Sequence, residues 1–436
     1  AANATNSGTA GSLALSGINV DIDYAEISAS TASNASSSSA ASVTIDATGS
    51  FALDESNVTA STTGDVDAGN ITLTSQNESL NISNSTVGST SLGGTGQAGE
   101  ISLLGQAINF IGSLLNVETS SSDVTNSPAN ITLDGQGGDI VLSKVEAGLA
   151  TQGLTASTSG AANAGSISIE NVAALTLDGV AVLSEALAGS TGNAGDISVN
   201  TTGAISLSNG TNIATSTDGS GFAGQIVMTG SSVTGDNVTI ASQATQTNSG
   251  QAGSITITGD TVAFTGGSEL STASNSDLVT PSAGITLNAT DGELTLADTE
   301  VEGSTTGNTD AGDIKLYGQS YRQTGGQMVT SSGTSTSEGL DVGSGDAGNI
   351  TIARDDLGAS VESFILAGGG DIQATTEGSG NAGTISIANA GNLTISGTAD
   401  NKASISVAAN ATNSGTAGSL SLTGINVDID YADISA

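Results

Sequence analysis

Cysteine, histidine and tryptophan are absent from this sequence of 436 residues, and proline occurs only twice. Without cysteine there can be no disulfide or thiol chemistry, and without histidine as well the usual zinc ligands are missing. The lack of histidine also removes the side chain that most often serves as a general base near neutral pH. A cysteine-free composition suits a bacterial protein that crosses membranes unfolded during export.

Basic residues are also scarce, because 5 lysines and arginines face 43 acidic residues, a formal net charge of −38. Nucleic acids and anionic membrane surfaces would be repelled by this charge, so cations, basic proteins and neutral glycans are the expected partners. No apolar run of 18 residues is present, so we expect no membrane-spanning segment. The sequence starts at Ala1 without Met, and any export signal is expected to be removed or to lie outside it.

Aromatic residues make up 2% of the chain and Gly contributes 61 residues, a composition that resembles a disordered low-complexity segment. A recurring phrase argues against disorder. Its form at residues 192–199 is GNAGDISV: a polar turn, Ala-Gly, and an apolar–polar–apolar triplet. The triplet begins fourteen times, in steps of 28 to 36 residues that sum to 407, at Leu13, Val43, Ile71, Ile101, Ile131, Ile167, Ile197, Ile226, Ile255, Ile285, Ile314, Ile350, Ile385 and Leu420. Such a period indicates a solenoid.

Each repeat contains three short segments with strand character. The triplet alternates buried and exposed positions, as in Ile167-Ser-Ile, and a second alternating segment such as Leu175-Thr-Leu follows it. A third segment has one large apolar residue followed by small ones, as in Ile213-Ala-Thr-Ser. We predict an all-β parallel β-helix of thirteen to fourteen triangular coils, continuous over residues 1–436 as one domain. The nearest helix candidate, 180–189, is interpreted as strand plus loop.

The corner before each triplet carries Asn, Asp or Gln followed by Ala-Gly, as at Asn163, Asn193, Asn381, Asp67, Asp310, Asp346, Gln97 and Gln251. Asn and Asp tolerate left-handed backbone angles and Gly adopts them freely, so we expect this corner to repeat without strain. The scarcity of proline agrees with central parallel strands, which need every backbone donor.

Four steps between triplets are long. In the step from Ile131 to Ile167 the extra residues, 146–164, are predicted to lie between the third strand and the next triplet. Residues 331–346 are predicted to enlarge the same corner, whereas 354–362 enlarge the corner after the triplet. Insertions that gather on one edge of a solenoid are typical of a binding face.

Residues 1–29 and 408–436 match at 26 of 29 positions, with an offset of 407 residues. The differences are Ala14/Ser421, Ser16/Thr423 and Glu26/Asp433. This super-repeat favours a segment of a longer tandem array, or subunits stacked end to end. Thirteen coils at about 4.8 Å each predict an axial period of about 62 Å.

The phrases GNAGDISV, GNAGTISI and QAGSITI, spaced by about 30 residues, resemble the repetitive shaft of large exported bacterial adhesins of the filamentous haemagglutinin type. Cyanobacterial surface-layer-like exoproteins carry similar repeats. The resemblance covers the whole chain and implies a right-handed β-helix, secretion through a partner outer-membrane pore and a place at the cell surface. The amino-terminal secretion domain of that family is missing from this sequence, and the super-repeat is more regular than a typical shaft.

Acidic residues at three places suggest weak calcium binding. Asp21 and Asp23 point outward on one strand, and if Ile22 stacks on Leu53, then Asp54 lies one coil above Asp23. The corners with Asp65/Asp67 and with Asn308/Asp310/Asp313 are the other two candidates. The alternative for all three is a solvated acidic face, so no metal ligand is assigned.

Two further patterns are considered. Arg354-Asp355-Asp356 places a base beside two acids, as in polysaccharide lyases built on β-helices, and the alternative is an ordinary loop cluster. The outward Ser and Thr columns resemble an ice-binding face, but Ala14, Val227 and Lys315 interrupt them. High β-propensity and solubility explain those columns better.

The sequence therefore predicts an extracellular structural protein without catalytic residues: a repeat segment of a β-solenoid filament, sheath or adhesion shaft. Its expected partners are copies of itself, with divalent cations such as Ca²⁺ and glycans as further candidates, and no nucleic acid. The second candidate is a ligand-binding adhesin that uses the inserted loops. The third is a polysaccharide-processing enzyme.

Overall fold

The computed structural model describes residues 11–31, 40–125, 128–146, 151–247, 249–277, 284–335, 341–410 and 415–436. It divides into two compact units, residues 1–224 and 225–436, which are described separately. In these described ranges the regular elements are all β-strands, so the prediction of an all-β fold without helices is confirmed. Residues 180–189 contain a strand, as expected.

Each coil of the first unit has three sides, named here in chain order. The first sides are β1 (Leu13–Gly17), β4 (Val43–Ala47), β11 (Ile131–Asp134), β14 (Ile167–Val172) and β17 (Ile197–Thr201). The second sides are β2 (Val20–Asp23), β5 (Phe51–Asp54), β12 (Ile140–Ser143), β15 (Leu175–Asp178) and β18 (Ala204–Ser208), and β7 (Ile71–Ser83) and β9 (Ile101–Ile111) form both sides. The third sides are β3 (Glu26–Ser28), β6 (Asn57–Thr59), β8 (Thr86–Ser91), β10 (Leu114–Thr119), β13 (Gly153–Thr158), β16 (Ala181–Ala186) and β19 (Asn212–Ala214).

The second unit repeats this plan. Its first sides are β20 (Ile226–Thr229), β23 (Ile255–Gly259), β32 (Ile350–Ala353), β35 (Ile385–Ile387) and β38 (Leu420–Leu422). The second sides are β21 (Ser232–Asp236), β24 (Thr261–Thr265), β33 (Val361–Ala367), β36 (Asn389–Ser396) and β39 (Asn426–Asp430), and β26 (Ile285–Ala297) and β28 (Ile314–Thr324) form both sides. The third sides are β22 (Thr239–Ala241), β25 (Glu269–Ser271), β27 (Glu300–Glu302), β29 (Gln327–Ser332), β34 (Asp371–Thr376), β37 (Ala403–Ser406) and β40 (Ala432–Ser435).

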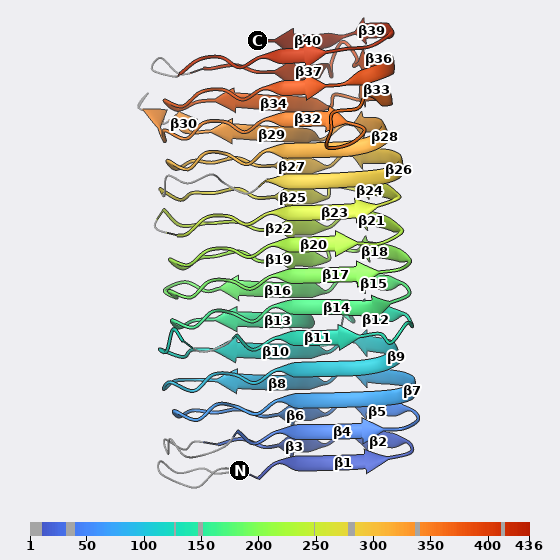
Figure 1. The fold of residues 1–436 in the computed structure, drawn as a ribbon, viewed down its shortest axis with the longest axis vertical. Helices are drawn as coiled ribbons and strands as arrows, with labels where there is room; N and C mark the ends of the chain where they lie inside the picture. Colours follow the sequence, from blue (N-terminus) through green and yellow to red (C-terminus); the bar gives the residue numbers. More distant parts are fainter. Residues whose placement is uncertain are drawn as a thin grey trace. The chain divides into compact units, whose positions relative to one another are not determined.

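Corresponding sides of successive coils pair in parallel, with the triplet residues in register. Ile131 pairs with Ile101 and Ile167 in the first unit, and Ile285 pairs with Ile255 and Ile314 in the second. In each unit the first sides run left to right in front and the third sides right to left behind, as the chain rises (Figure 1). The coils are therefore right-handed, and the predicted β-solenoid is confirmed. The step of 29 residues from Ile197 to Ile226 continues the repeat between the units, and a single domain over 1–436 stays a prediction of the sequence.

The inward triplet positions form the core. Ile71 and Leu73 are fully buried, whereas Thr72 between them is half-buried, and the same alternation holds on the second sides. Aromatic rings are used on the second side, where Tyr321 and Phe364 of successive coils stack with ring centroids 5.3 Å apart. Burial of each large apolar side chain stabilises the fold by about 1.5–3 kcal/mol, so stability accumulates coil by coil.

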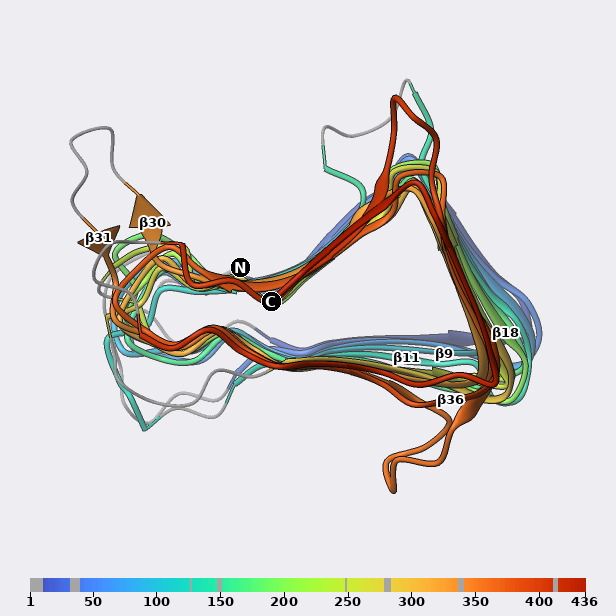
Figure 2. The same ribbon diagram turned by 90° about the horizontal axis from the view of Figure 1, so that it is seen from above.

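The third side leads into a narrow part of each coil that the predicted triangle does not include. Figure 2 shows a three-sided section that tapers into a thin lobe on the left, between the third side and the next first side. Small residues such as Ser89, Ser91 and Thr158 are buried as this lobe begins. The limited space explains why the third segment has one large apolar residue and then Ser, Thr or Ala.

One predicted insertion site is wrong. β12 ends at Ser143 and β13 begins at Gly153, so the extra residues of the step from Ile131 to Ile167 lie between the second and third sides. The reason is that Leu154 occupies the third-side column between Leu115 and Val182. Residues 147–150 of that segment lie outside the described residues.

The other insertions occur at different corners (Figure 2). The antiparallel pair β30 (Thr334–Ser335) and β31 (Asp341–Val342) follows the third side β29, as predicted for 331–346. Residues 354–360 separate β32 from β33, also as predicted, and 397–402 separate β36 from β37. The insertions therefore use three corners and do not gather on one edge.

A paired substitution tests the inward and outward assignment. Ile197 is 1% exposed and the adjacent Ser198 is exposed. We expect Ile197→Asp to lower the free energy of unfolding by at least about 3 kcal/mol, because it removes core packing and buries a charge. Ser198→Asp should change it by less than about 0.5 kcal/mol. Denaturant unfolding, with hydrogen exchange on β14 and β17, measures both, and equal losses would contradict the assignment.

Candidate functional site

Open grooves lie over the corner that precedes the first side in both units. The groove in the second unit has a volume of about 480 Å³ and is lined by Asp310, Asp313, Lys315, Asp346, Asn349 and Asn381, with Ala and Gly residues between them. The groove in the first unit, of about 320 Å³, is lined in part by Asp67, Asn70, Gln97 and Glu100. The recurring feature is thus the Asx-Ala-Gly corner, which we call the corner groove.

The residue before Ala-Gly forms one row of side-chain acceptors along the corner groove. Asp310 Oδ1 accepts the backbone N–H of Asp346 at 2.9 Å, and Asp346 Oδ1 accepts that of Asn381 at 2.7 Å. In the first unit Asn163 Oδ1 accepts the N–H of Asn193 at 2.9 Å. These side chains therefore satisfy the backbone donor at the same position of the next coil, whereas the buried Oε1 of Gln97 in this row has no hydrogen-bond partner.

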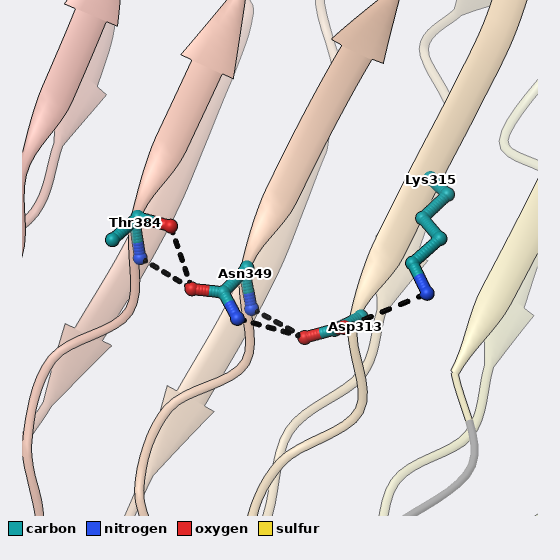
Figure 3. Close-up of polar contacts among 4 residues, drawn as sticks. All are labelled: Asp313, Lys315, Asn349 and Thr384. Atoms are coloured by element: carbon teal, nitrogen blue, oxygen red, sulfur yellow. Dashed lines mark hydrogen bonds and ion pairs between the residues drawn. The ribbon is translucent and has the colours of Figure 1, made fainter. Parts of the chain in front are cut away.

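A second row begins three residues later, immediately before the triplet. Asp313 Oδ1 accepts the N–H of Asn349 at 2.9 Å, and Asn349 Oδ1 accepts the N–H of Thr384 at 3.0 Å (Figure 3). Asn349 Nδ2 also donates to Asp313 Oδ1 at 3.2 Å. An amide that follows an acid in the row thus supplies a donor where a second carboxylate would repel the first.

The Asx-Ala-Gly corners do not use the left-handed backbone angles that these residues tolerate. Most non-glycine residues with positive φ follow the second-side strands directly, at Tyr24, Glu55, Asn84, Asn209, Asn237, Asp298 and Tyr431, and two others, Gln136 and Asn171, lie before the second side. Glycine is needed in Ala-Gly because the coils approach closely there. A Cβ added at Gly165 would lie 1.6 Å from the carbonyl oxygen of Ala129, and one at Gly383 would lie 1.8 Å from that of Gly348.

Buried hydroxyl groups on the third side hold these glycines in place. Ser184 Oγ donates to the carbonyl of Gly165 at 2.8 Å and accepts the N–H of Gly195 at 2.8 Å. Ser89 makes the same pair of contacts with Gly69 and Gly99. One buried hydroxyl thus links two successive corners and satisfies a carbonyl oxygen and an N–H group there.

The structure does not assemble the predicted calcium ligands into a metal site. Ile22 pairs with Leu53 and Asp23 with Asp54, as proposed, but the described residues contain no group of three or more acidic side chains placed to hold an ion. Asp65 and Asp67 accept the backbone N–H groups of Thr95 and Gln97. The other candidates also serve the fold, because Asp310 and Asp313 belong to the two acceptor rows and the Asn308 amide donates to Asp277. Weak calcium binding stays a prediction.

The remaining predicted sites are placed as follows. Arg354 lies 3.8 Å from Glu362, whereas Asp355 Oδ1 accepts the N–H groups of Leu357 and Ala359 within the same loop. Arg354 and Asp355 therefore have different partners in this loop. Lys315 interrupts the outward Thr column between Thr286 and Thr351, and its Nζ lies 3.7 Å from Asp313 Oδ2. That ion pair is exposed and stabilises little.

Sequence reasoning missed a column of acids on the third side of the second unit. Glu269 pairs in register with Glu300, and a groove of about 410 Å³ over this column also includes Asp298 and Asp371. Burial raises the pKa of Glu269, and the Glu300 carboxylate raises it further. Burial also raises the pKa of Glu302, although a hydrogen bond from Ser304 opposes this. The sequence contained a signal for this column, because Glu269 and Glu300 each directly precede the large apolar residue of their third segment, Leu270 and Val301.

The fold and the corner groove define the chain as a parallel β-solenoid repeat protein. In comparisons with known proteins, no family model, curated protein or solved structure matches the chain. Within the described ranges, no helix is both long and apolar enough to cross a bilayer.

Substitution of a corner glycine tests whether successive coils approach each other too closely at this position to allow a side chain. We expect Gly165→Ala to lower the free energy of unfolding by at least about 2 kcal/mol, because the Cβ meets a backbone oxygen that cannot move away. Gly88→Ala is the matched control, since its Cβ would lie 3.7 Å from its nearest neighbour, the Asn116 carbonyl. That control should be neutral or stabilising by up to about 1 kcal/mol. Urea unfolding measures the stability of both variants. Similar losses of stability in the two would contradict the close approach of the coils at Gly165.

The acceptor rows are tested at Asn193, whose Oδ1 accepts the N–H of Phe222 at 2.8 Å. Asn193→Ala should cost about 1 kcal/mol and reduce the hydrogen-exchange protection of the Phe222 amide. Asn193→Asp retains the acceptor oxygen and should preserve that protection. Loss of protection in both variants would show that the Asn193 side-chain oxygen does not protect the Phe222 amide.

The acidic column predicts a pH dependence. A carboxyl whose pKa is raised by folding contributes stability below its ordinary pKa, near 4.5, and loses that contribution as pH rises through the raised value. Glu300→Gln should therefore raise stability at pH 7 by about 0.5 kcal/mol and flatten its fall above pH 4.5. Glu118→Gln, whose register neighbours are Thr90 and Ser157, is the control. Thermal unfolding between pH 4 and 8 measures both, and an unchanged profile for Glu300→Gln would contradict the effect.

Proposed function

We propose that this chain is a structural repeat segment of an extracellular β-solenoid fibre. Such a fibre would resemble the shafts of filamentous haemagglutinin-type and surface-layer-like exoproteins. The observation that carries the proposal is the like-on-like stacking of coils. The described coils repeat the same three sides, and polar corner residues such as Asp310 and Asp313 bond their counterparts in the next coil. Such a design extends a chain along one direction without needing a different partner at each level.

The surface agrees with a scaffold role. Outward positions carry mainly Ser, Thr, Asn and acids, and the net charge of −38 keeps the fibre soluble and repels nucleic acid. The same charge makes divalent cations the expected agents of lateral association, bound diffusely along the corner grooves. We propose no catalytic step, because Arg354 pairs with Glu362 while Asp355 bonds its own loop. Insertions at three different corners also give the loop-based adhesin no single binding edge.

Imaging of the native material tests this proposal. We expect thin unbranched filaments with a layer line near 4.8 Å and an axial period of about 62 Å or a small multiple of it. Antibodies against the folded chain should label intact cells without permeabilisation. Compact isolated particles, or labelling only after permeabilisation, would refute the extracellular fibre.

A further inference from the structure

Asparagine occupies the left-handed position after the second side in three coils. Asn84, Asn209 and Asn237 have φ values of 48°, 56° and 54°, and each directly follows the last residue of its second-side strand. Asn209-Gly210 is the single Asn-Gly pair in the sequence, whereas serine follows Asn84 and valine follows Asn237. The three corners therefore hold the same side chain in a similar backbone conformation, before different residues.

The corner that contains Asn209 is one residue longer than the other two. Two residues separate β7 from β8 in the corner of Asn84, and two separate β21 from β22 in the corner of Asn237. Three residues, 209–211, separate β18 from β19. An additional residue in one corner changes which of its backbone groups can reach the next coil.

Gly210 is the additional residue, because Thr211 takes the position that Ser85 has in the shorter corner. Thr211 Oγ1 donates to the carbonyl of the last β18 residue, Ser208, at 2.8 Å, and Ser85 Oγ donates to that of the last β7 residue at 2.7 Å. The Thr211 N–H also donates to the Ser208 carbonyl at 3.1 Å, which closes a tight turn over the two residues between them. Both of these turn residues, Asn209 and Gly210, are exposed.

In the shorter corners the N–H group after asparagine is held by a hydroxyl of the next coil. The Ser85 N–H donates to Ser113 Oγ at 3.0 Å, and the Val238 N–H donates to Ser268 Oγ at 3.3 Å. In the described part of the chain, the Gly210 N–H has no hydrogen-bond acceptor. A Cβ added at Gly210 would have no atom within 4 Å apart from its chain neighbours, so the space around this residue is open.

We propose that Asn209 deamidates spontaneously in the folded protein, with water as the only other reactant, because the longer corner leaves the Gly210 N–H free to react. The products are aspartate and isoaspartate at this position. The proposal does not depend on the fibre function, since it rests on the chemistry of one corner.

The reaction has two steps. The backbone nitrogen of Gly210 attacks the side-chain Cγ of Asn209 and loses its proton, and the side-chain nitrogen leaves as ammonia, so that a five-membered succinimide forms. Water then adds to one of the two ring carbonyl carbons and opens the ring. Opening at the side-chain carbonyl gives aspartate, and opening at the main-chain carbonyl gives isoaspartate. Glycine favours ring closure because it has no Cβ to hinder the approach and lets the turn rotate.

Deamidation alters the contact with the preceding coil. Asn209 Nδ2 donates to Asp178 Oδ1, and Ser208 Oγ donates to the same oxygen at 3.0 Å. A carboxylate in place of the amide cannot donate and repels Asp178 at neutral pH. Isoaspartate also lengthens the backbone of the turn. We therefore expect the products to loosen the neighbouring hydrogen bond from the Gly179 N–H to the Ser208 carbonyl, which is 3.0 Å long.

Peptide mapping of the full chain tests the proposal. The protein is incubated for weeks at neutral pH, both folded and in guanidinium chloride, and mass spectrometry with chromatographic separation of the two products follows each asparagine. In the folded chain we expect Asn209 to convert at least about ten-fold faster than Asn84 or Asn237. Hydrogen-exchange protection of the Gly179 N–H should fall several-fold in the converted fraction.

Ser85→Gly is the matched control, because it places glycine after Asn84 in a corner where the following N–H keeps its acceptor, Ser113 Oγ. In guanidinium chloride the two Asn-Gly pairs of this variant should convert at similar rates, since the dipeptides are the same. In the folded variant Asn209 should convert several-fold faster than Asn84. Hydrogen exchange at the substituted position verifies that the N–H remains bonded.

Val238→Gly repeats the comparison at Asn237, should the first variant lose its bonded N–H. Conversion of Asn209 no faster than that of Asn237 in the folded wild-type chain would overturn the proposal. Equal conversion of the two Asn-Gly pairs in a folded control variant would also overturn it, because the additional residue would then have no effect. Unchanged protection of the Gly179 N–H would contradict the loosened contact between the coils.

Discussion

The rest of the structure depends on parallel stacking in register, in which each side chain has a counterpart about 4.8 Å away in the next coil. Any residue placed in a column must therefore tolerate a similar residue above and below it. Ile and Leu satisfy this condition by burying one another, as Ile131 does between Ile101 and Ile167. Asn satisfies it by bonding the next backbone, and Gly satisfies it by leaving room for the next carbonyl oxygen.

The same constraint explains where the fold is weak. Glutamates in register repel each other: burial raises the pKa of Glu269, and the Glu300 carboxylate in register raises it further. In the corner groove the conflict is smaller, because acids such as Asp310 and Asp313 each accept a backbone N–H from the next coil. Asn349 also follows Asp313 in the second row, although Asp346 follows Asp310 in the first. Acidic residues in this protein therefore have two physical roles. Those in the corner rows stabilise the stack, and those in the third-side column oppose it.

Much of the fold could be predicted from the sequence, because strand alternation and the period of the triplets are local patterns. The three sides, the pairing of Ile22 with Leu53 and the insertion at 331–346 follow from counting residues. The role of the Asx-Ala-Gly corner could not be predicted in the same way. Left-handed geometry and close approach both select Gly, and only the distance from Gly165 to the Ala129 carbonyl distinguishes them. The 144–152 insertion was misplaced because Val145 and Leu154 both suit the third-side column.

By itself the sequence determined the composition of each column and therefore the class of fold, since periodic apolar residues can be buried only by stacking copies of one coil. It also determined that residues 408–436 repeat residues 1–29. Only the tertiary structure decided which neighbour each column has, and hence that Leu154 occupies the third-side column between Leu115 and Val182. The physical reason is that burial and hydrogen bonding between coils depend on residues about 30 positions away, whose separation in space no local pattern contains.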